Sequence, residues 1–108
     1  MQSDTPAYDI SVVICTYNRG DILGETLGSY AAMAAASPVR TELLVIDNNS
    51  SDATARIARE FVEGRADARY VFEATPGLSH ARNTGIREAN GEIIAFADDD
   101  VYFEPGWL

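Results

Sequence analysis

The stretch Gly91-Glu92-Ile93-Ile94-Ala95-Phe96-Ala97-Asp98-Asp99-Asp100 decides the fold that this sequence predicts. A run of apolar and small residues between a glycine and a group of acids is typical of a fully buried parallel strand. We expect the carboxylates to lie at the carboxyl end of that strand, where open α/β sheets bind their ligands. Because side chains alternate along an extended segment, Asp98 and Asp100 should point one way and Asp99 the other. Adjacent carboxylates repel one another, and a bound divalent cation would relieve that repulsion. Oxygen ligands suit Mg²⁺ or Mn²⁺. The alternative interpretation is an acidic turn exposed to solvent.

Strand and helix patterns alternate in the sequence that precedes this stretch. Short apolar, β-branched runs predict strands, and longer segments with helical spacing predict helices. The strands are expected over residues 10–15, 41–46 and 68–72, and the helices over residues 22–35, 52–63 and 78–89. This order predicts an α/β fold of Rossmann-like type, with a mainly parallel sheet that has helices on both faces. Residues 1–9 are expected to be a loose lead-in to the folded part.

Polar residues follow three of the four predicted strands. Thr16-Tyr17-Asn18-Arg19 follows the first strand, Asp47-Asn48-Asn49 follows the second, and the acids follow the fourth. Since the carboxyl ends of parallel strands meet at one edge of a sheet, these residues should converge in a ligand crevice. Asp21 is expected to cap the first helix, and Ser50 or Ser51 the second. Within this group, Arg19 is expected to be a solvated charge at the rim.

The composition excludes several classes of function. The chain has 108 residues, 46% of them hydrophobic, which fits one globular domain or a piece of one. Its net charge of −9 argues against binding to nucleic acid or to anionic membranes. All its basic residues are arginines, and the absence of lysine excludes a Walker-A loop and Schiff-base chemistry.

The expected location of the segment is cytoplasmic. The single Cys15 permits no internal disulfide, which fits a reducing compartment. No apolar run approaches the roughly 20 residues that span a bilayer, and the N-terminus lacks a signal-peptide pattern.

Other α/β ligand sites fit the sequence poorly. A dinucleotide-binding fold would show Gly-x-Gly-x-x-Gly after the first strand, and a receiver-type phosphoacceptor domain would show an acid pair there together with a lysine. Ser79 and His80 are neighbours on a predicted helix, so they do not face each other as a catalytic pair would. His80, the only histidine, is expected near solvent at the start of that helix.

Four segments resemble family 2 glycosyltransferases, in the family's order and with its strand context. They are ISVVICTYNR (residues 10–19), ELLVIDNNSSDAT (42–54), TPGLSHARNTGI (75–86) and GEIIAFADDD (91–100). The resemblance covers nearly the whole chain from Ile10 onward. It implies a GT-A fold that binds a nucleotide-diphosphate sugar, with a UDP-sugar favoured, through Mn²⁺ or Mg²⁺.

The resemblance implies a nucleotide site in the loops after the first two strands. Thr16, Tyr17 and Asn18 fall in the loop that family members place around the nucleotide base, where an aromatic ring can stack. Asp47 and Asn48 match an acid pair whose second member usually accepts the uracil imino hydrogen. Here the second member is an amide, and its oxygen can still accept a hydrogen bond.

The resemblance also implies phosphate and metal ligands. Arg82, near the start of the third helix, is expected to pair with phosphate oxygens, with an ion pair to Glu88 as the alternative. Asp98 and Asp100 match the family's Asp-x-Asp element and are the expected metal ligands. Asp100 is the more direct ligand and Asp98 lies nearer the ribose, while Asp99 belongs to the expected nucleotide-binding set.

The implied reaction is a metal-dependent, inverting transfer of the hexosyl type. A divalent metal neutralises the leaving diphosphate, and a carboxylate base deprotonates the acceptor hydroxyl. In the family that base lies well beyond the Asp-x-Asp element, so it is expected beyond Leu108. Residues 10–108 are therefore expected to be the donor-binding part of the domain, inactive alone. The acceptor would be a saccharide, a lipid-linked compound or another hydroxyl compound.

Two rival functions remain open at this point. One is a non-catalytic nucleotide-binding module of the same fold. The other is a nucleotidyltransferase, although that class would carry a glycine-rich basic loop after the first strand. A truncated sheet would also leave an open edge strand, so we expect self-association of the segment. Peripheral membrane association would require parts outside these residues.

Overall fold

The structure, a computed structural model, describes residues 7–108 and shows seven elements in alternating order. The strands are β1 (Tyr8–Thr16), β2 (Thr41–Asp47), β3 (Ala68–Phe72) and β4 (Gly91–Ala97), and the helices are α1 (Leu23–Ala36), α2 (Thr54–Val62) and α3 (Leu78–Glu88). The predicted alternation is confirmed. Strand β1 begins at Tyr8, inside the predicted lead-in 1–9, and residues 1–6 of that lead-in lie outside the described residues.

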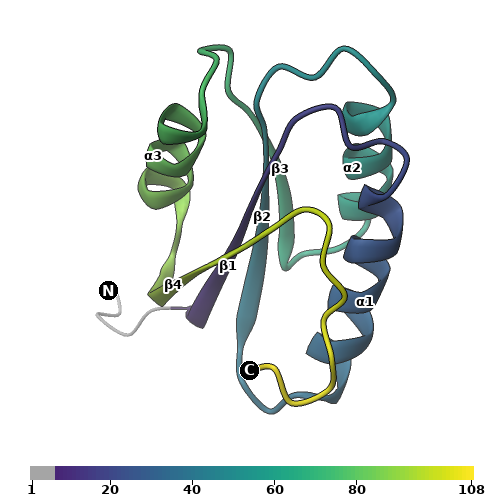
Figure 1. The fold of residues 1–108 in the computed structure, drawn as a ribbon. Coiled ribbons are helices and arrows are strands. Elements are labelled where there is room, and N and C mark those ends of the chain that lie inside the picture. Colours follow the sequence, from purple (N-terminus) through teal and green to yellow (C-terminus); the bar gives the residue numbers. More distant parts are fainter. Residues whose placement is uncertain (1–6) are drawn as a thin grey trace.

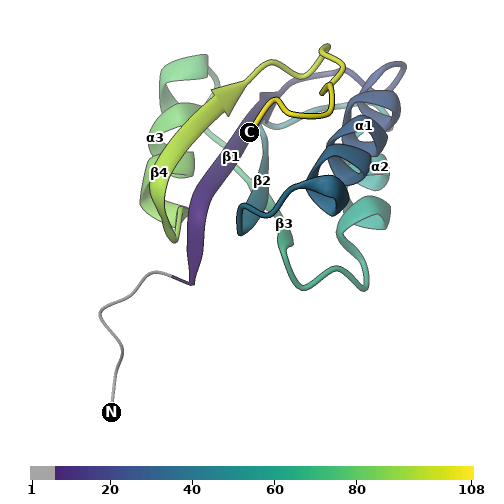
Figure 2. The same cartoon turned by 90° about the horizontal axis from the view of Figure 1, so that it is seen from below.

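The four strands form one parallel sheet in the order β3-β2-β1-β4. Helices α1 and α2 cover one face of the sheet and α3 covers the other (Figure 1). Figure 2 shows the same layers from below, with β4 beside β1 at one edge of the sheet. The prediction of a parallel α/β sheet with helices on both faces is thus confirmed.

Alternation along the central strands divides the core between the two faces. On β1, Val12 and Ile14 pack toward α1 and α2, whereas Val13 packs toward α3 with Leu44 of β2. Helix α3 lies very close to the sheet, because a Cβ added at Gly85 would stand 2.6 Å from Cγ1 of Val13. Strand β2 is buried along its whole length, as expected for a strand with neighbours on both sides.

Strand β4 departs from its prediction as a fully buried strand. It is parallel as expected, but it pairs only with β1 and forms an edge of the sheet. Ile93 is 58% exposed and Phe96 is 42% exposed. The physical reason is that no helix or strand among residues 7–108 covers the outer side of β4. The edge strand and exposed apolar side chains are the features from which self-association was expected.

The segment after β4 lies along helix α1 (Figures 1 and 2). Thr26 of α1 donates a hydrogen bond from Oγ1 to the carbonyl oxygen of Asp99 at 3.1 Å. The amide of Phe103 donates to Oγ of Ser29 at 2.9 Å, and its buried ring meets the Tyr30 ring edge-on, with 5.8 Å between centroids. These contacts fix the acidic segment relative to the sheet.

The predicted helix caps are wrong. Ile22 occupies the N-cap of α1 and forms no side-chain capping bond, so Asp21 does not cap this helix. Helix α2 begins at Thr54, two residues later than predicted, because Asp52 Oδ1 accepts hydrogen bonds from the amide and hydroxyl of Thr54. No helix within residues 7–108 is long and apolar enough to span a membrane.

Candidate functional site

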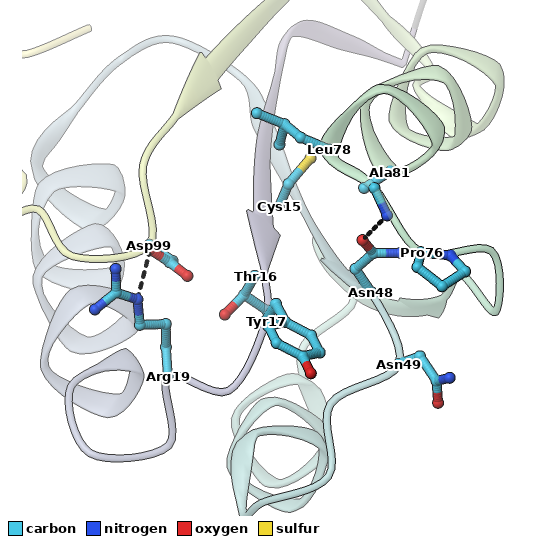
Figure 3. A pocket seen from close by; sticks show the side chains of 11 residues that line it. Cys15, Thr16, Tyr17, Arg19, Asn48, Asn49, Pro76, Leu78, Ala81 and Asp99 are labelled. Atoms are coloured by element: carbon cyan, nitrogen blue, oxygen red, sulfur yellow. Dashed lines mark hydrogen bonds and ion pairs between the residues drawn. The ribbon is translucent and has the colours of Figure 1, made fainter.

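The loops at the carboxyl ends of the strands enclose a cavity of about 510 Å³ (Figure 3). Its walls come from the end of β1, the loop after β2, the loop before and the first turns of α3, and the segment after β4. The lining residues are Cys15, Thr16, Tyr17, Arg19, Asn48, Asn49, Pro76, Gly77, Leu78, Ala81 and Asp99. The prediction that polar residues after three strands converge at one edge is confirmed.

Thr16 and Tyr17 lie centrally in this cavity, between the Arg19–Asp99 pair and Asn48 (Figure 3). Thr16 is only 2% exposed, and its Oγ1 finds no hydrogen-bond partner within residues 7–108. A buried hydroxyl without a partner costs free energy, so this atom would gain from a hydrogen bond to a ligand that reaches it. Tyr17 is 58% exposed, which leaves its ring free to stack on a planar group.

Asn18 shapes the loop instead of lining the cavity. Its backbone has a φ of 50°, a conformation that asparagine tolerates better than most residues. The Asn18 amide donates to Oγ of Ser50 at 2.9 Å, and Asn18 Oδ1 accepts from the amide of Ser51 at 2.8 Å. Ser50 and Ser51 therefore join the loops after β1 and β2, which corrects the prediction that one of them caps α2.

Asp47 is buried, does not line the cavity, and is held by two hydrogen bonds. Its Oδ1 accepts from the amide of Ser50 at 3.0 Å, and its Oδ2 accepts from the Tyr70 hydroxyl at 2.6 Å. Burial, together with this bond to a carboxylate, raises the pKa of Tyr70 to about 12. The Asp47 side chain thus shapes the turn after β2.

Asn48 connects the loop after β2 to the loop that leads into α3. Its Oδ1 accepts from the amide of Gly77 at 2.9 Å, and its Nδ2 donates to the carbonyl oxygens of Thr75 at 2.7 Å and Glu73 at 3.3 Å. Both polar atoms of the side chain are therefore engaged with the protein. The amide fixes one wall of the cavity, a role that the sequence reasoning did not foresee.

Glu73 is a second supporting residue that sequence reasoning missed. It accepts a hydrogen bond from the Thr84 hydroxyl and another from the Thr75 amide at 2.9 Å. These bonds hold the pKa of the Glu73 carboxyl below its usual range. The sequence signal was an acid two residues before Thr75 of the Thr-Pro-Gly turn, near enough to bond the turn's own backbone.

Arg19 and Asp99 form an ion pair across one side of the cavity, with 3.6 Å between Nε and Oδ1 (Figure 3). Arg19 is exposed, as expected of a solvated rim charge, but this ion pair was not predicted. Asp98 and Asp100 are exposed and do not line the cavity, so the predicted alternation of the three acids is consistent with the structure. Within residues 7–108, no three His, Cys, Asp or Glu side chains converge as a ready metal site.

Arg82 lies on α3, outside the cavity lining. Its guanidinium stands over the Phe96 ring, 5.8 Å from the centroid, and the side chain is exposed. The alternative ion pair with Glu88 is not formed, since Glu88 pairs with Arg69 at 3.2 Å.

Cys15 lines the cavity, which the sequence analysis did not predict. Burial raises the pKa of its thiol to about 11, so the thiol is neutral near pH 7.

Comparison with known proteins finds a family model and relatives described as glycosyltransferases. Residues 11–108 match the family described as glycosyl transferase family 2. The chain is 39% identical over 101 residues to validoxylamine A glucosyltransferase of Streptomyces hygroscopicus subsp. limoneus, which covers 92% of this chain and 22% of that protein.

Solved structures share the fold. S. aureus TarS 1–349 in complex with UDP-GlcNAc superposes with a TM-score of 0.69 at 27% identity, over 85% of this chain and 26% of that one. The mannosyltransferase PcManGT of Pyrobaculum calidifontis, in complex with GDP-Man and Mn²⁺, gives a TM-score of 0.72 at 29% identity, over 91% of this chain and 30% of that one. This chain thus spans about a third or less of the length of these proteins. It has a GT-A-type α/β fold, and it belongs to glycosyl transferase family 2.

Proposed function

We propose that residues 10–108 form the donor-binding part of a glycosyltransferase of the hexosyl type, which takes its sugar from a nucleotide diphosphate, with UDP favoured. The acceptor is a hydroxyl compound. One observation carries the proposal: a single cavity is lined by residues from all four sequence segments that resemble the family. The relatives add support, since one is named a glucosyltransferase and two were solved with nucleotide sugars.

Thr16 and Tyr17 bind the nucleoside in this proposal. The Tyr17 ring stacks on the base, and Thr16 Oγ1 gains from the ligand the hydrogen bond that it lacks in the protein. Asn18, Asp47 and Asn48 act mainly by holding these loops in place, because their side chains are bonded to the protein. Arg82 is left as a second cation beside the cavity, available to a phosphate through its exposed guanidinium.

The residues after β4 fit a divalent cation bound together with the donor. Asp98 and Asp100 are exposed, and neither forms an ion pair with a residue of 7–108. Mg²⁺ and similar hard cations are commonly held by one or two carboxylates plus substrate phosphates, so a cluster of three protein ligands is not required. When bound, the cation would neutralise negative charge on the leaving diphosphate.

The chemistry assigned to these residues is binding and orientation of the donor. Asp99 lines the cavity beside the nucleoside-binding residues, and Thr26 fixes its backbone from α1. Holding the donor in one orientation lowers the entropic cost of bringing it and the acceptor into the reactive geometry. The transfer proceeds with inversion, and none of the residues lining the cavity is assigned as the general base.

Thermal unfolding with a panel of nucleotides tests this proposal. A ligand at about 100 times its Kd stabilises a protein by roughly 2.7 kcal/mol. For a domain of this size that corresponds to a rise in Tm of about 10 °C or more. We expect that rise with UDP and Mn²⁺ and a smaller one with uridine and Mn²⁺. Equal Tm values with and without UDP, GDP and dTDP would refute the proposed function.

A further inference from the structure

We propose that Arg19 is the diphosphate-positioning residue of the cavity, held by Asp99 until the donor arrives and then bound to the phosphate oxygens. This inference rests on the proposed function and assigns a role to a residue that was not among the predicted site residues. Arg19 is the only basic residue among those that line the cavity. In a chain of net charge −9, that cation is an important local attraction for an anionic ligand.

None of the other arginines lines the cavity. Their partners lie outside the cavity lining, in ion pairs or against aromatic rings: Arg40 with Asp9, Arg56 with Glu60, Arg59 with Tyr70, Arg65 with Asp67, Arg69 with Glu88, Arg82 with Phe96 and Arg87 with Glu73. Only the Arg19–Asp99 pair has both partners in the cavity wall.

The Arg19–Asp99 contact is built so that it can be exchanged. The Nε–Oδ1 distance is 3.6 Å, too long for a hydrogen bond, and the Arg19 side chain is 48% exposed whereas that of Asp99 is 14% exposed. A half-exposed ion pair of this kind contributes little to stability, so breaking it costs little. A phosphate offers the guanidinium two parallel, charge-assisted hydrogen bonds, which are stronger.

Both ends of the pair are held by backbone contacts that leave the two side chains free. The Arg19 amide donates to Oγ1 of Thr54 at 2.8 Å, and the Arg19 carbonyl oxygen accepts from the amide of Leu23 at 2.8 Å. The Asp99 carbonyl oxygen accepts from Thr26. The guanidinium therefore moves while the loop keeps its place. Its departure leaves the Asp99 carboxylate unpaired and facing the nucleotide, so donor binding and loss of the ion pair are coupled.

Substitution at Arg19 separates this role from a structural one. We expect Arg19→Gln to weaken UDP binding, measured by calorimetry with Mn²⁺, by at least about tenfold, the effect of losing hydrogen bonds to a charged group. Affinity for uridine, followed by NMR titration, should stay unchanged because uridine has no phosphate. The UDP affinity of Arg19→Lys should lie between those of the unsubstituted chain and Arg19→Gln, since lysine keeps the charge but not the planar guanidinium.

Arg56→Gln is the matched control, because it removes the same charge from an exposed pair on α2. The proposal is overturned if Arg19→Gln binds UDP as tightly as the control, or if uridine and UDP weaken together. Unchanged circular dichroism would show that the variant is folded. If the unsubstituted chain binds none of UDP, GDP and dTDP, the proposed function fails as a whole, an outcome distinct from a failure confined to Arg19.

Discussion

Asn48 Oδ1 accepts a hydrogen bond from the backbone amide of Gly77 at 2.9 Å, which ties the loop after β2 to the loop that begins α3. The same side chain donates from Nδ2 to the carbonyl oxygens of Thr75 and Glu73. An amide can make this set of bonds and a carboxylate cannot, because a carboxylate would face two carbonyl oxygens without a proton to donate. The residue that departs from the family's acid pair is thus adapted to its surroundings in this chain.

Asn48→Asp should destabilise the fold and loosen this wall of the cavity. We expect the free energy of unfolding to fall by about 2 kcal/mol, since two donated hydrogen bonds are lost and a buried charge is placed near carbonyl oxygens. Urea denaturation measures the change. Asn49→Asp is the control, because Asn49 is exposed and its φ of 64° suits Asp as well as Asn. Equal stability of Asn48→Asp and the control would contradict the role given to the Asn48 amide.

Tyr70 should make stability depend on pH in the alkaline range. Its pKa is raised from 10.0 to about 12 by burial and by its bond to Asp47, so the folded state favours the neutral phenol. The resulting stabilisation is fully present below pH 10 and is lost as the pH rises from 10 to 12. In Tyr70→Phe, the free energy of unfolding should be about 1 kcal/mol lower at pH 7 and should vary less over that range.

Tyr102→Phe is the control for this measurement, because the Tyr102 side chain is well exposed. It should show the pH profile of the unsubstituted chain. Burial also raises the pKa of Tyr30, and that contribution is shared by all three proteins. If Tyr70→Phe kept the full loss of stability between pH 10 and 12, the coupling of Tyr70 to Asp47 would be wrong.

Gly91 is required for the pairing of β4 with β1. A Cβ at this position would lie 2.6 Å from the backbone nitrogen of Ser11 and 2.7 Å from its Oγ, and the backbone cannot move aside without breaking the ladder. We expect Gly91→Ala to cost about 3 kcal/mol in urea denaturation. Gly28→Ala should instead stabilise by about 0.5–1 kcal/mol, because Gly28 is inside α1 with nothing within 4 Å of the added carbon. Effects of the same sign at both sites would contradict the packing described.

Asp100→Asn should remove the metal dependence of nucleotide binding. Asp100 is the more direct ligand in the proposed site, so its loss leaves the cation with the diphosphate and a less direct carboxylate, which weakens Mn²⁺ binding. Calorimetry of UDP with and without Mn²⁺ should give the same weak affinity for this variant. Glu104→Gln removes another exposed acid four residues further along and should behave as the unsubstituted chain does. Retention of tight, Mn²⁺-dependent binding by Asp100→Asn would remove Asp100 from the metal site.

The sequence was sufficient for the order of the elements and for the edge at which the site lies. Apolar runs such as residues 41–46 predict the strands, and the polar residues directly after them predict the edge with the site; both patterns are local in the sequence. The exposure of β4 was not predictable, because an apolar run reads the same whether or not another strand pairs with its outer side. The contacts of Asn48 and Arg19 were also missed, since their partners lie 29 and 80 residues away along the chain.

The most direct test of the donor site is calorimetric titration of UDP into this chain, once with Mn²⁺ and once with EDTA. We expect saturable binding with Mn²⁺ and a loss of at least about tenfold in affinity with EDTA, because the carboxylates after β4 then repel the diphosphate. GDP and dTDP under the same conditions would identify the base. Equal UDP affinity in Mn²⁺ and EDTA, or the absence of binding by all three nucleotides, would contradict a metal-dependent nucleotide site at this edge of the sheet.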